Sequence, residues 1–188
     1  MDERVLSTDQ IDRILHGLNE WQWWDAEVQA AYPWFTYPFI QELKTWDLKN
    51  KTVLEYGGGR GTKWWRSKCK WVTTIETSKE WAEVIEEDCK GLNNGKIFIV
   101  DEESRIDYVM WHSSDIIIID GEHRKECLQR WKDAKGITLI ADNWDQAHVW
   151  IGDGSVQLMK DKKGYIFEQP DHQGENGRNK WKTIYWNL

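Results

Sequence analysis

The chain has 188 residues, a length that suits one domain able to bury about 70% of the surface of its unfolded chain. Its formal charge is −7, and the charged residues are interspersed, which disfavours nonspecific binding to nucleic acid. No run approaches the roughly 18 apolar residues of a membrane span, and the first residues are polar, so we expect a cytoplasmic protein with no membrane segment. Three widely spaced cysteines, Cys69, Cys89 and Cys127, are expected to be reduced and buried.

Residues 1–48 are predicted to form a helical cap. The polar residues 7–10 offer helix-capping side chains ahead of apolar residues at helical spacing. Pro33 and Pro38 bracket a rigid turn, and Pro38 suits the first turn of a helix that reaches about Trp46. The chain has fifteen tryptophans, and we expect those near the N-terminus to pack between helices, with a lid over a ligand as the alternative.

From Thr52 onward, predicted strands and helices alternate. The strands cover 52–57, 71–76, 96–100, 115–120 and 137–142, and the helices cover 62–69, 78–90, 123–134 and 144–150. The four isoleucines 116–119 indicate a strand that is covered on both faces. Two last strands, 163–168 and 182–187, are expected to form an antiparallel hairpin at the sheet edge. The sequence therefore predicts a single α/β domain, in which residues 49–188 form a seven-stranded, mostly parallel sheet with helices on both faces.

A glycine-rich loop follows the first of these strands, in the segment VLEYGGGRGT at 53–62. Glycines at 57, 59 and 61 remove side chains that would keep the backbone from a ligand, and they permit a tight turn. A dinucleotide-binding turn needs G-x-G-x-x-G, but counting from Gly57 puts Thr62 at the third glycine, which disfavours a nicotinamide cofactor. An ordinary strand-to-helix turn is the other interpretation. Glu76 closes the next strand, where an acid that binds a ribose belongs.

The E-x-G-x-G-x-G pattern that begins at Glu55 resembles motif I of the class I S-adenosylmethionine-dependent methyltransferases. The resemblance implies a Rossmann-like core and S-adenosylmethionine as the cofactor. Asp101 or Glu102, at the next strand end, is expected near the adenine. The cofactor-binding residues are predicted to be Glu55, Tyr56, Gly57, Gly58, Gly59, Gly61, Thr62, Glu76, Asp101 and Asp120.

Polar residues also end the strands 115–120 and 137–142. Asp120, Asp142 and Asn143 offer the hard oxygen ligands that suit Mg²⁺, and they resemble the metal site of the catechol-type, cation-dependent O-methyltransferases. His123 stands where that family has a lysine base, so His123 and Asp120 are the candidate catalytic residues. The alternative is ordinary turn chemistry at 142–143, with Asp120 serving only the cofactor and His123 only the helix start.

Four further residues are candidates for contacts with the substrate. Arg124 could hold an anionic group, and Trp144 follows the Asp-Asn pair directly. The loop after residue 170 should overhang the same sheet edge, since the strand before it is expected to run parallel to the others, and it contributes His172 and Arg178.

A second resemblance spans roughly residues 33–188. The segments PWFTYP at 33–38, KWW at 63–65 and the stretch from Asp120 to Cys127 resemble a family of small, mostly uncharacterised methyltransferase-like proteins, although Arg60-Gly61-Thr62 departs from its usual loop. The sequence thus predicts an S-adenosylmethionine-dependent methyltransferase that acts on a small molecule at oxygen. The alternatives are a protein that binds S-adenosylmethionine or S-adenosylhomocysteine without turnover, and the disfavoured nicotinamide-dependent oxidoreductase.

Overall fold

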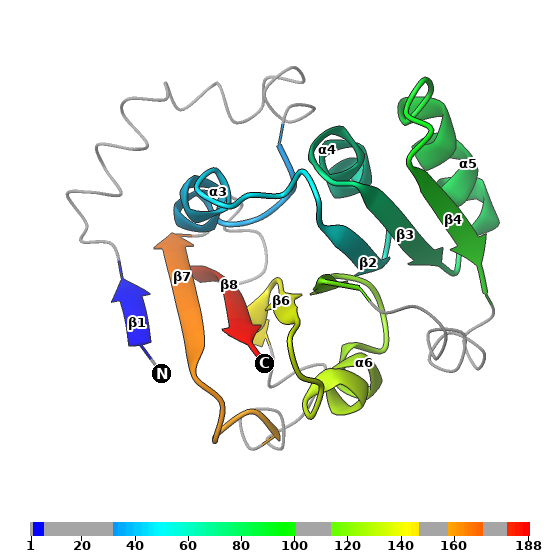
Figure 1. Cartoon of the computed structure of the whole chain (residues 1–188). Coiled ribbons are helices and arrows are strands. Elements are labelled where there is room, and N and C mark those ends of the chain that lie inside the picture. The colour runs from blue at the N-terminus through cyan, green and yellow to red at the C-terminus, as the bar shows by residue number, and fades with distance from the viewer. Residues whose placement is uncertain (1, 6–31, 101–113, 147–157, 171–179) are drawn as a thin grey trace.

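The computed structural model describes residues 2–5, 32–100, 114–146, 158–170 and 180–188, and its centre is one mixed sheet (Figure 1). The strands are β1 (Asp2–Val5), β2 (Thr52–Tyr56), β3 (Trp71–Glu76), β4 (Gly95–Ile99), β5 (Ile116–Ile119), β6 (Thr138–Ala141), β7 (Gly164–Pro170) and β8 (Lys180–Asn187). They lie in the order β1-β7-β8-β6-β5-β2-β3-β4, and β8 alone runs antiparallel to its neighbours.

The seven predicted strands are confirmed, including the C-terminal hairpin of β7 and β8. The direction predicted for β7 is also confirmed, because β7 and β6 both run opposite to β8. The eighth strand, β1, pairs with β7 at the edge and was not predicted. Its sequence, Asp-Glu-Arg-Val, lacks the apolar alternation by which a strand is predicted. An edge strand does not need that alternation, because backbone hydrogen bonds alone can hold it.

Helices cover both faces of the sheet. On one face lie α3 (Tyr37–Leu43), α4 (Arg60–Lys68) and α5 (Lys79–Asp88), and α6 (Arg124–Trp131) lies on the other (Figure 1). The predicted helix 144–150 is described only as the 3₁₀ turn η2 (Trp144–Gln146). The predicted helix near the N-terminus lies outside the described residues. Within the described part of the chain, no helix has the length and apolar character needed to cross a membrane.

Strand β2 separates two hydrophobic cores because its side chains alternate between the faces of the sheet. Val53 packs with Phe39 and Trp65 beneath α3 and α4. Leu54 and Tyr56 belong to the other core, which lies beneath α6. Glu55 therefore points toward the α4 face, although it lies within a strand that is buried on both sides.

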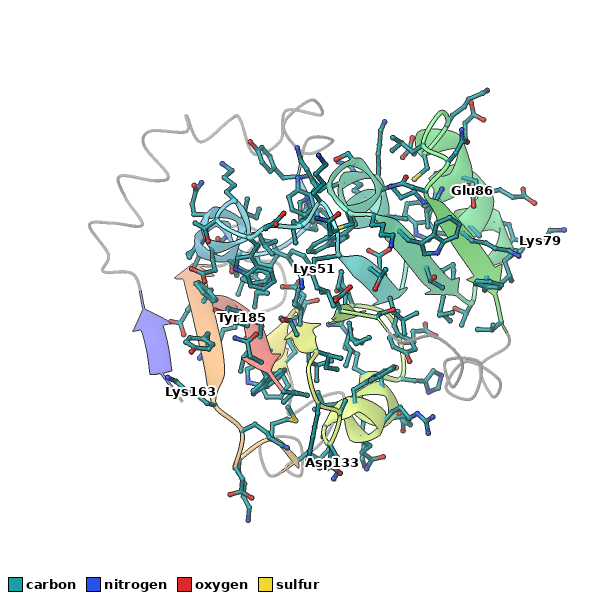
Figure 2. All side chains as sticks on the ribbon, viewed as in Figure 1. Lys51, Lys79, Glu86, Asp133, Lys163 and Tyr185 are labelled. Atoms are coloured by element: carbon teal, nitrogen blue, oxygen red, sulfur yellow. The ribbon has the colours of Figure 1, made fainter. Side chains whose placement is uncertain are left out.

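The hairpin is joined to the first face by aromatic packing. The ring of Tyr185 on β8, labelled in Figure 2, lies against Phe39 of α3 with 5.8 Å between ring centroids, and its hydroxyl donates to Glu42 of α3 at 3.1 Å.

The pairing of β2 with its two neighbouring strands determines which strand ends lie together. Tyr56 of β2 pairs with Ile75 of β3 and with Ile119 of β5, so these strands end at the same edge.

Candidate functional site

The glycine loop begins directly after β2, and each of its first three glycines meets a different environment. Gly57 has a φ of +83°, and an added Cβ would lie 2.4 Å from the Cα of Gly121. A Cβ on Gly58 would lie 2.7 Å from side-chain atoms of Ile85 and Thr74. A Cβ on Gly59 would meet no atom within 4 Å. The first two glycines therefore permit close packing, whereas Gly59 leaves space at the start of α4.

Glu55 anchors this loop from the interior. The Gly59 amide donates to the Thr62 hydroxyl at 3.0 Å, and the Thr62 and Thr74 hydroxyls donate to the Glu55 carboxyl at 2.6 Å and 3.0 Å. Glu55 is only 4% exposed, and this burial raises its pKa to about 8 although both hydroxyls oppose the rise. Glu55 and Thr62 thus hold the loop in place from within. Thr74, which the sequence analysis did not include, completes the anchor.

Glu76 lies at the end of β3 against the other side of the loop. Its carboxylate accepts hydrogen bonds from the amides of Gly58 at 3.0 Å, Thr77 at 2.7 Å and Ser78 at 3.0 Å. The Trp81 indole donates to the Gly58 carbonyl at 2.8 Å, while the residue stays 44% exposed. The geometry thus brings Glu76 to the glycine loop, as the spacing predicts, and adds Trp81 as a flanking residue that the prediction lacks.

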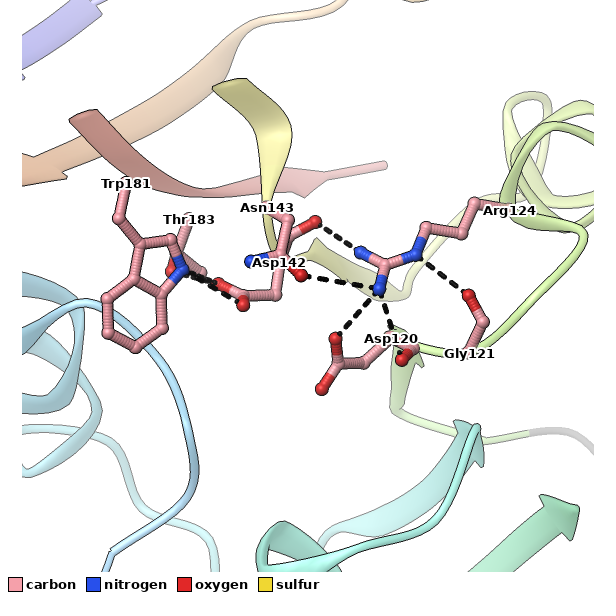
Figure 3. Close-up of polar contacts among 7 residues, drawn as sticks. All are labelled: Asp120, Gly121, Arg124, Asp142, Asn143, Trp181 and Thr183. Atoms are coloured by element: carbon pink, nitrogen blue, oxygen red, sulfur yellow. Dashed lines mark hydrogen bonds and ion pairs between the residues drawn. The ribbon is translucent and has the colours of Figure 1, made fainter. Parts of the chain in front are cut away.

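The loops after β5 and β6 are joined by Arg124 (Figure 3). Its guanidinium donates to the carbonyls of Gly121 at 2.8 Å, Asp142 at 2.7 Å and Asp120 at 3.2 Å. It also donates to the Asp120 carboxylate at 3.2 Å and to the Asn143 side-chain oxygen at 3.3 Å. The Arg124 guanidinium is thus hydrogen-bonded to groups of the protein itself, whereas the predicted contact with a substrate would need it to be open to a ligand.

The Asp142 carboxylate points away from this cluster, toward β8. It accepts hydrogen bonds from the Trp181 indole at 3.0 Å and the Thr183 hydroxyl at 2.5 Å (Figure 3). Burial and the nearby Asp120 raise the pKa of Asp142, and the donors from β8 oppose this rise. Asp120 and Asn143 face the guanidinium, so the three predicted metal ligands do not converge. Among the residues described, no group of three His, Cys, Asp or Glu side chains could hold a metal ion.

No protein-family model and no curated protein matches this sequence. Solved structures match its fold. The cofactor-bound protein Rv0187 from MTB aligns with a TM-score of 0.61 at 15% identity, over 95% of this chain and 94% of that one. The C-terminal domain of precorrin-6Y C5,15-methyltransferase from Rhodobacter capsulatus aligns with a TM-score of 0.56 at 17% identity, over 83% and 91%. NodS, an N-methyltransferase from Bradyrhizobium japonicum WM9 in complex with S-adenosylhomocysteine, aligns with a TM-score of 0.56 at 12% identity, over 73% of this chain and 78% of that one.

The chain has the class I methyltransferase fold. In open sheets of this kind the ligand lies beyond the carboxyl ends of the parallel strands, which is the edge that carries Gly57, Glu76 and Asp120. Two hollows of about 480 and 390 Å³ lie elsewhere, around the loop that precedes β2, and neither is lined by the glycine loop. The strand-end loops are therefore the candidate site.

His123 and Asn143 share an unusual backbone conformation at this edge. Their φ angles are 52° and 51°, and they are the only non-glycine residues with positive φ in the described ranges. His123 is exposed and directly precedes α6, where its side chain makes no capping hydrogen bond. Such conformations cost about 1 to 3 kcal/mol each and concentrate at functional sites.

The remaining predicted site residues have different positions. Tyr56 and Trp144 are core residues: the Tyr56 hydroxyl accepts from the Trp131 indole at 3.0 Å, and Trp144 packs edge-on against Trp186. Tyr56 is fully buried, and its carbonyl accepts a hydrogen bond from the Asp120 amide, so its predicted contact with the cofactor finds no support in this packing. The same holds for the predicted contact of Trp144 with the substrate. The predicted residues Asp101, His172 and Arg178 lie outside the described residues.

Proposed function

We propose that this protein is an S-adenosylmethionine-dependent methyltransferase that acts on a hydroxyl group of a small molecule. One observation carries the proposal: the Glu76 carboxylate is hydrogen-bonded to the amide of Gly58 beside the open space at Gly59. A cofactor in that space would meet backbone amides at the start of α4 and a carboxylate able to accept from two ribose hydroxyls.

The chemistry is an in-line displacement at a sulfonium methyl group, so the protein must orient the acceptor, remove its proton and exclude water. Asp120 and His123 support the choice of a hydroxyl acceptor. The Asp120 side chain is 32% exposed and lies next to Gly121, which touches the glycine loop. His123 is exposed in the same loop and is proposed as the general base.

The first experiment compares the binding of S-adenosylmethionine, S-adenosylhomocysteine and NAD by isothermal titration calorimetry. We expect binding of the first two and none of NAD, because the glycine spacing does not fit a dinucleotide. Binding of NAD alone would refute the proposal. A search for transfer of a labelled methyl group to hydroxyl-bearing acceptors follows.

Binding without turnover is the second candidate function. It is favoured by the many contacts that the polar side chains at the edge make with one another, in particular the bonds of Arg124 to Asp120 and Asn143. Cofactor binding with no methyl transfer to any acceptor class, small molecules and RNA included, would support this candidate.

Glu76→Ala should weaken S-adenosylmethionine binding by about ten- to a hundredfold, because a charge-assisted hydrogen bond contributes roughly 1.5 to 3 kcal/mol. Calorimetry measures the change. Glu83→Ala, at an exposed position of α5, is the matched control and should leave the affinity unchanged. Equal affinities for the two variants would remove Glu76 from the cofactor site.

His123→Ala should slow methyl transfer by about 10² to 10⁴-fold, the usual contribution of a general base, without changing cofactor affinity. Single-turnover kinetics with a saturating acceptor measures the rate of the chemical step. Asp120→Asn is the comparison: a large loss there, with full activity in His123→Ala, would transfer the role of base to Asp120.

A further inference from the structure

Arg124 connects the loop after β5 with the loop after β6. Its donors reach backbone carbonyls on both loops, at Gly121 and Asp142, and side chains on both, at Asp120 and Asn143. A guanidinium is planar and holds its five N–H donors in a fixed fork. Acceptors on both loops that satisfy this fork must therefore keep a fixed separation and orientation.

The guanidinium uses the oxygen atoms that a metal ion would need. Its Nη2 atom lies 3.2 Å from Asp120 Oδ1 and 3.3 Å from Asn143 Oδ1, and the side chain is only 14% exposed. A Mg²⁺ ion needs oxygens at about 2.0 to 2.1 Å in octahedral geometry, and it would be repelled by a cation at this distance. The third predicted ligand, the carboxylate of Asp142, is bonded to Trp181 and Thr183 on the other side.

Backbone geometry on both sides of the guanidinium supports a functional role for this arrangement. His123, which precedes Arg124, and Asn143, which accepts from it, both adopt left-handed conformations. The connection also reaches the glycine loop, because Gly121 lies so close to Gly57 that a Cβ added to Gly57 would overlap the Gly121 backbone. A shift of Arg124 would therefore be transmitted to Gly57.

We propose that Arg124 is the positioning residue of this site: its guanidinium takes the place of a metal ion, joining the loops after β5 and β6 and holding Gly121 against the glycine loop. Asp120, Asp142 and Asn143 accordingly bind no divalent cation. The methyl-transfer part of this inference rests on the proposed function, whereas the placement of the guanidinium rests on the geometry alone.

The first test uses Mn²⁺ as a paramagnetic probe for an oxygen-ligand metal site in the full-length protein. Electron paramagnetic resonance should show no stoichiometric Mn²⁺ binding, with or without S-adenosylmethionine, and EDTA should leave cofactor affinity unchanged. Stoichiometric Mn²⁺ binding that Asp120→Asn abolishes would overturn the proposal.

The second test removes the guanidinium and then supplies it from solution. Arg124→Ala should lower the melting temperature and weaken S-adenosylmethionine binding by about tenfold or more, since several hydrogen bonds to a charged group are lost. Guanidinium chloride at low millimolar concentration should restore part of both losses, while equal sodium chloride should not. Lys125→Ala, at an exposed position on the same helix, should behave as wild type.

Arg124→Lys serves if the alanine variant does not fold. Its single ammonium keeps the charge but cannot reach both loops, so cofactor affinity should still fall. Wild-type affinity and melting temperature in the lysine variant would overturn the positioning role. If the wild-type protein binds no S-adenosylmethionine, the proposed function fails, and the melting-temperature rescue alone decides the role of Arg124: no rescue by guanidinium refutes it.

Discussion

Gly57→Ala should destabilise the protein by about 3 kcal/mol or more, whereas Gly59→Ala should cost only about 1 kcal/mol, the usual effect of alanine at a helix N-cap. The two glycines are two residues apart but differ in surroundings. A methyl group on Gly57 would overlap the Gly121 backbone at a φ of +83°. Gly59 has an extended backbone with a φ of −177°, which any residue adopts, and open space at its Cβ position.

A comparison of these two variants separates effects on stability from effects on cofactor binding. Gly59→Ala should lower the melting temperature by only a few degrees but weaken S-adenosylmethionine binding about tenfold or more, because its methyl group would occupy the space proposed for the cofactor. Differential scanning calorimetry and titration calorimetry measure the two effects. Unchanged affinity in a well-folded Gly59→Ala variant would place the cofactor away from this residue.

The sequence predicts the central sheet well because its strands carry a local signal. Apolar runs such as Ile116–Ile119 are too short for a helix and end in polar residues, and Glu76 and Asp120 follow directly from those ends. The edge strand β1 has no such signal, since it is held by backbone pairing with residues of β7 that lie 163 positions further along the chain, as in the pair Asp2 and Tyr165.

The candidate site is predicted only where its parts are close in sequence. Glycine spacing identifies the loop, and parallel-sheet geometry brings Glu76 to it. The direction of the Asp142 side chain could not be predicted, because it depends on donors from Thr183 and Trp181, about forty residues away. In the same way, three oxygen-bearing residues at strand ends indicate a cation, and sequence spacing alone does not distinguish a metal ion from the guanidinium of Arg124.

The stability of the wild-type protein should fall as pH rises from about 4.5 to about 8, relative to a Glu55→Gln variant. Burial raises the pKa of Glu55 from 4.5 to about 8, so between these values the folded protein keeps a proton that the unfolded chain releases. Stability falls with pH wherever the folded state binds more protons. The contribution of the neutral Glu55 carboxyl to the free energy of unfolding is therefore complete below pH 4.5 and is lost as pH approaches 8.

The total change in the free energy of unfolding, relative to Glu55→Gln, should be a few kcal/mol and at most about 5 kcal/mol. This limit follows from about 1.36 kcal/mol for each unit of pKa difference. Urea unfolding of both proteins across this pH range measures it, because other titrating groups cancel in the difference. Glu83→Gln, at an exposed position on α5, is the control and should show no comparable trend. A difference between wild type and Glu55→Gln that stays constant with pH would show that Glu55 is ionised in the folded protein.

The same proton connects Glu55 to the glycine loop. The hydroxyls of Thr62 and Thr74 both donate to one carboxyl oxygen, and Thr62 in turn accepts from the Gly59 amide. Glutamine preserves an acceptor oxygen for these hydroxyls and remains neutral at every pH. Glu55→Gln should thus keep wild-type affinity for S-adenosylmethionine at pH 6, where both side chains are neutral in the folded protein, and exceed it above pH 8, where ionised Glu55 destabilises the anchor. Equal affinities at both pH values would confine the role of Glu55 to folding.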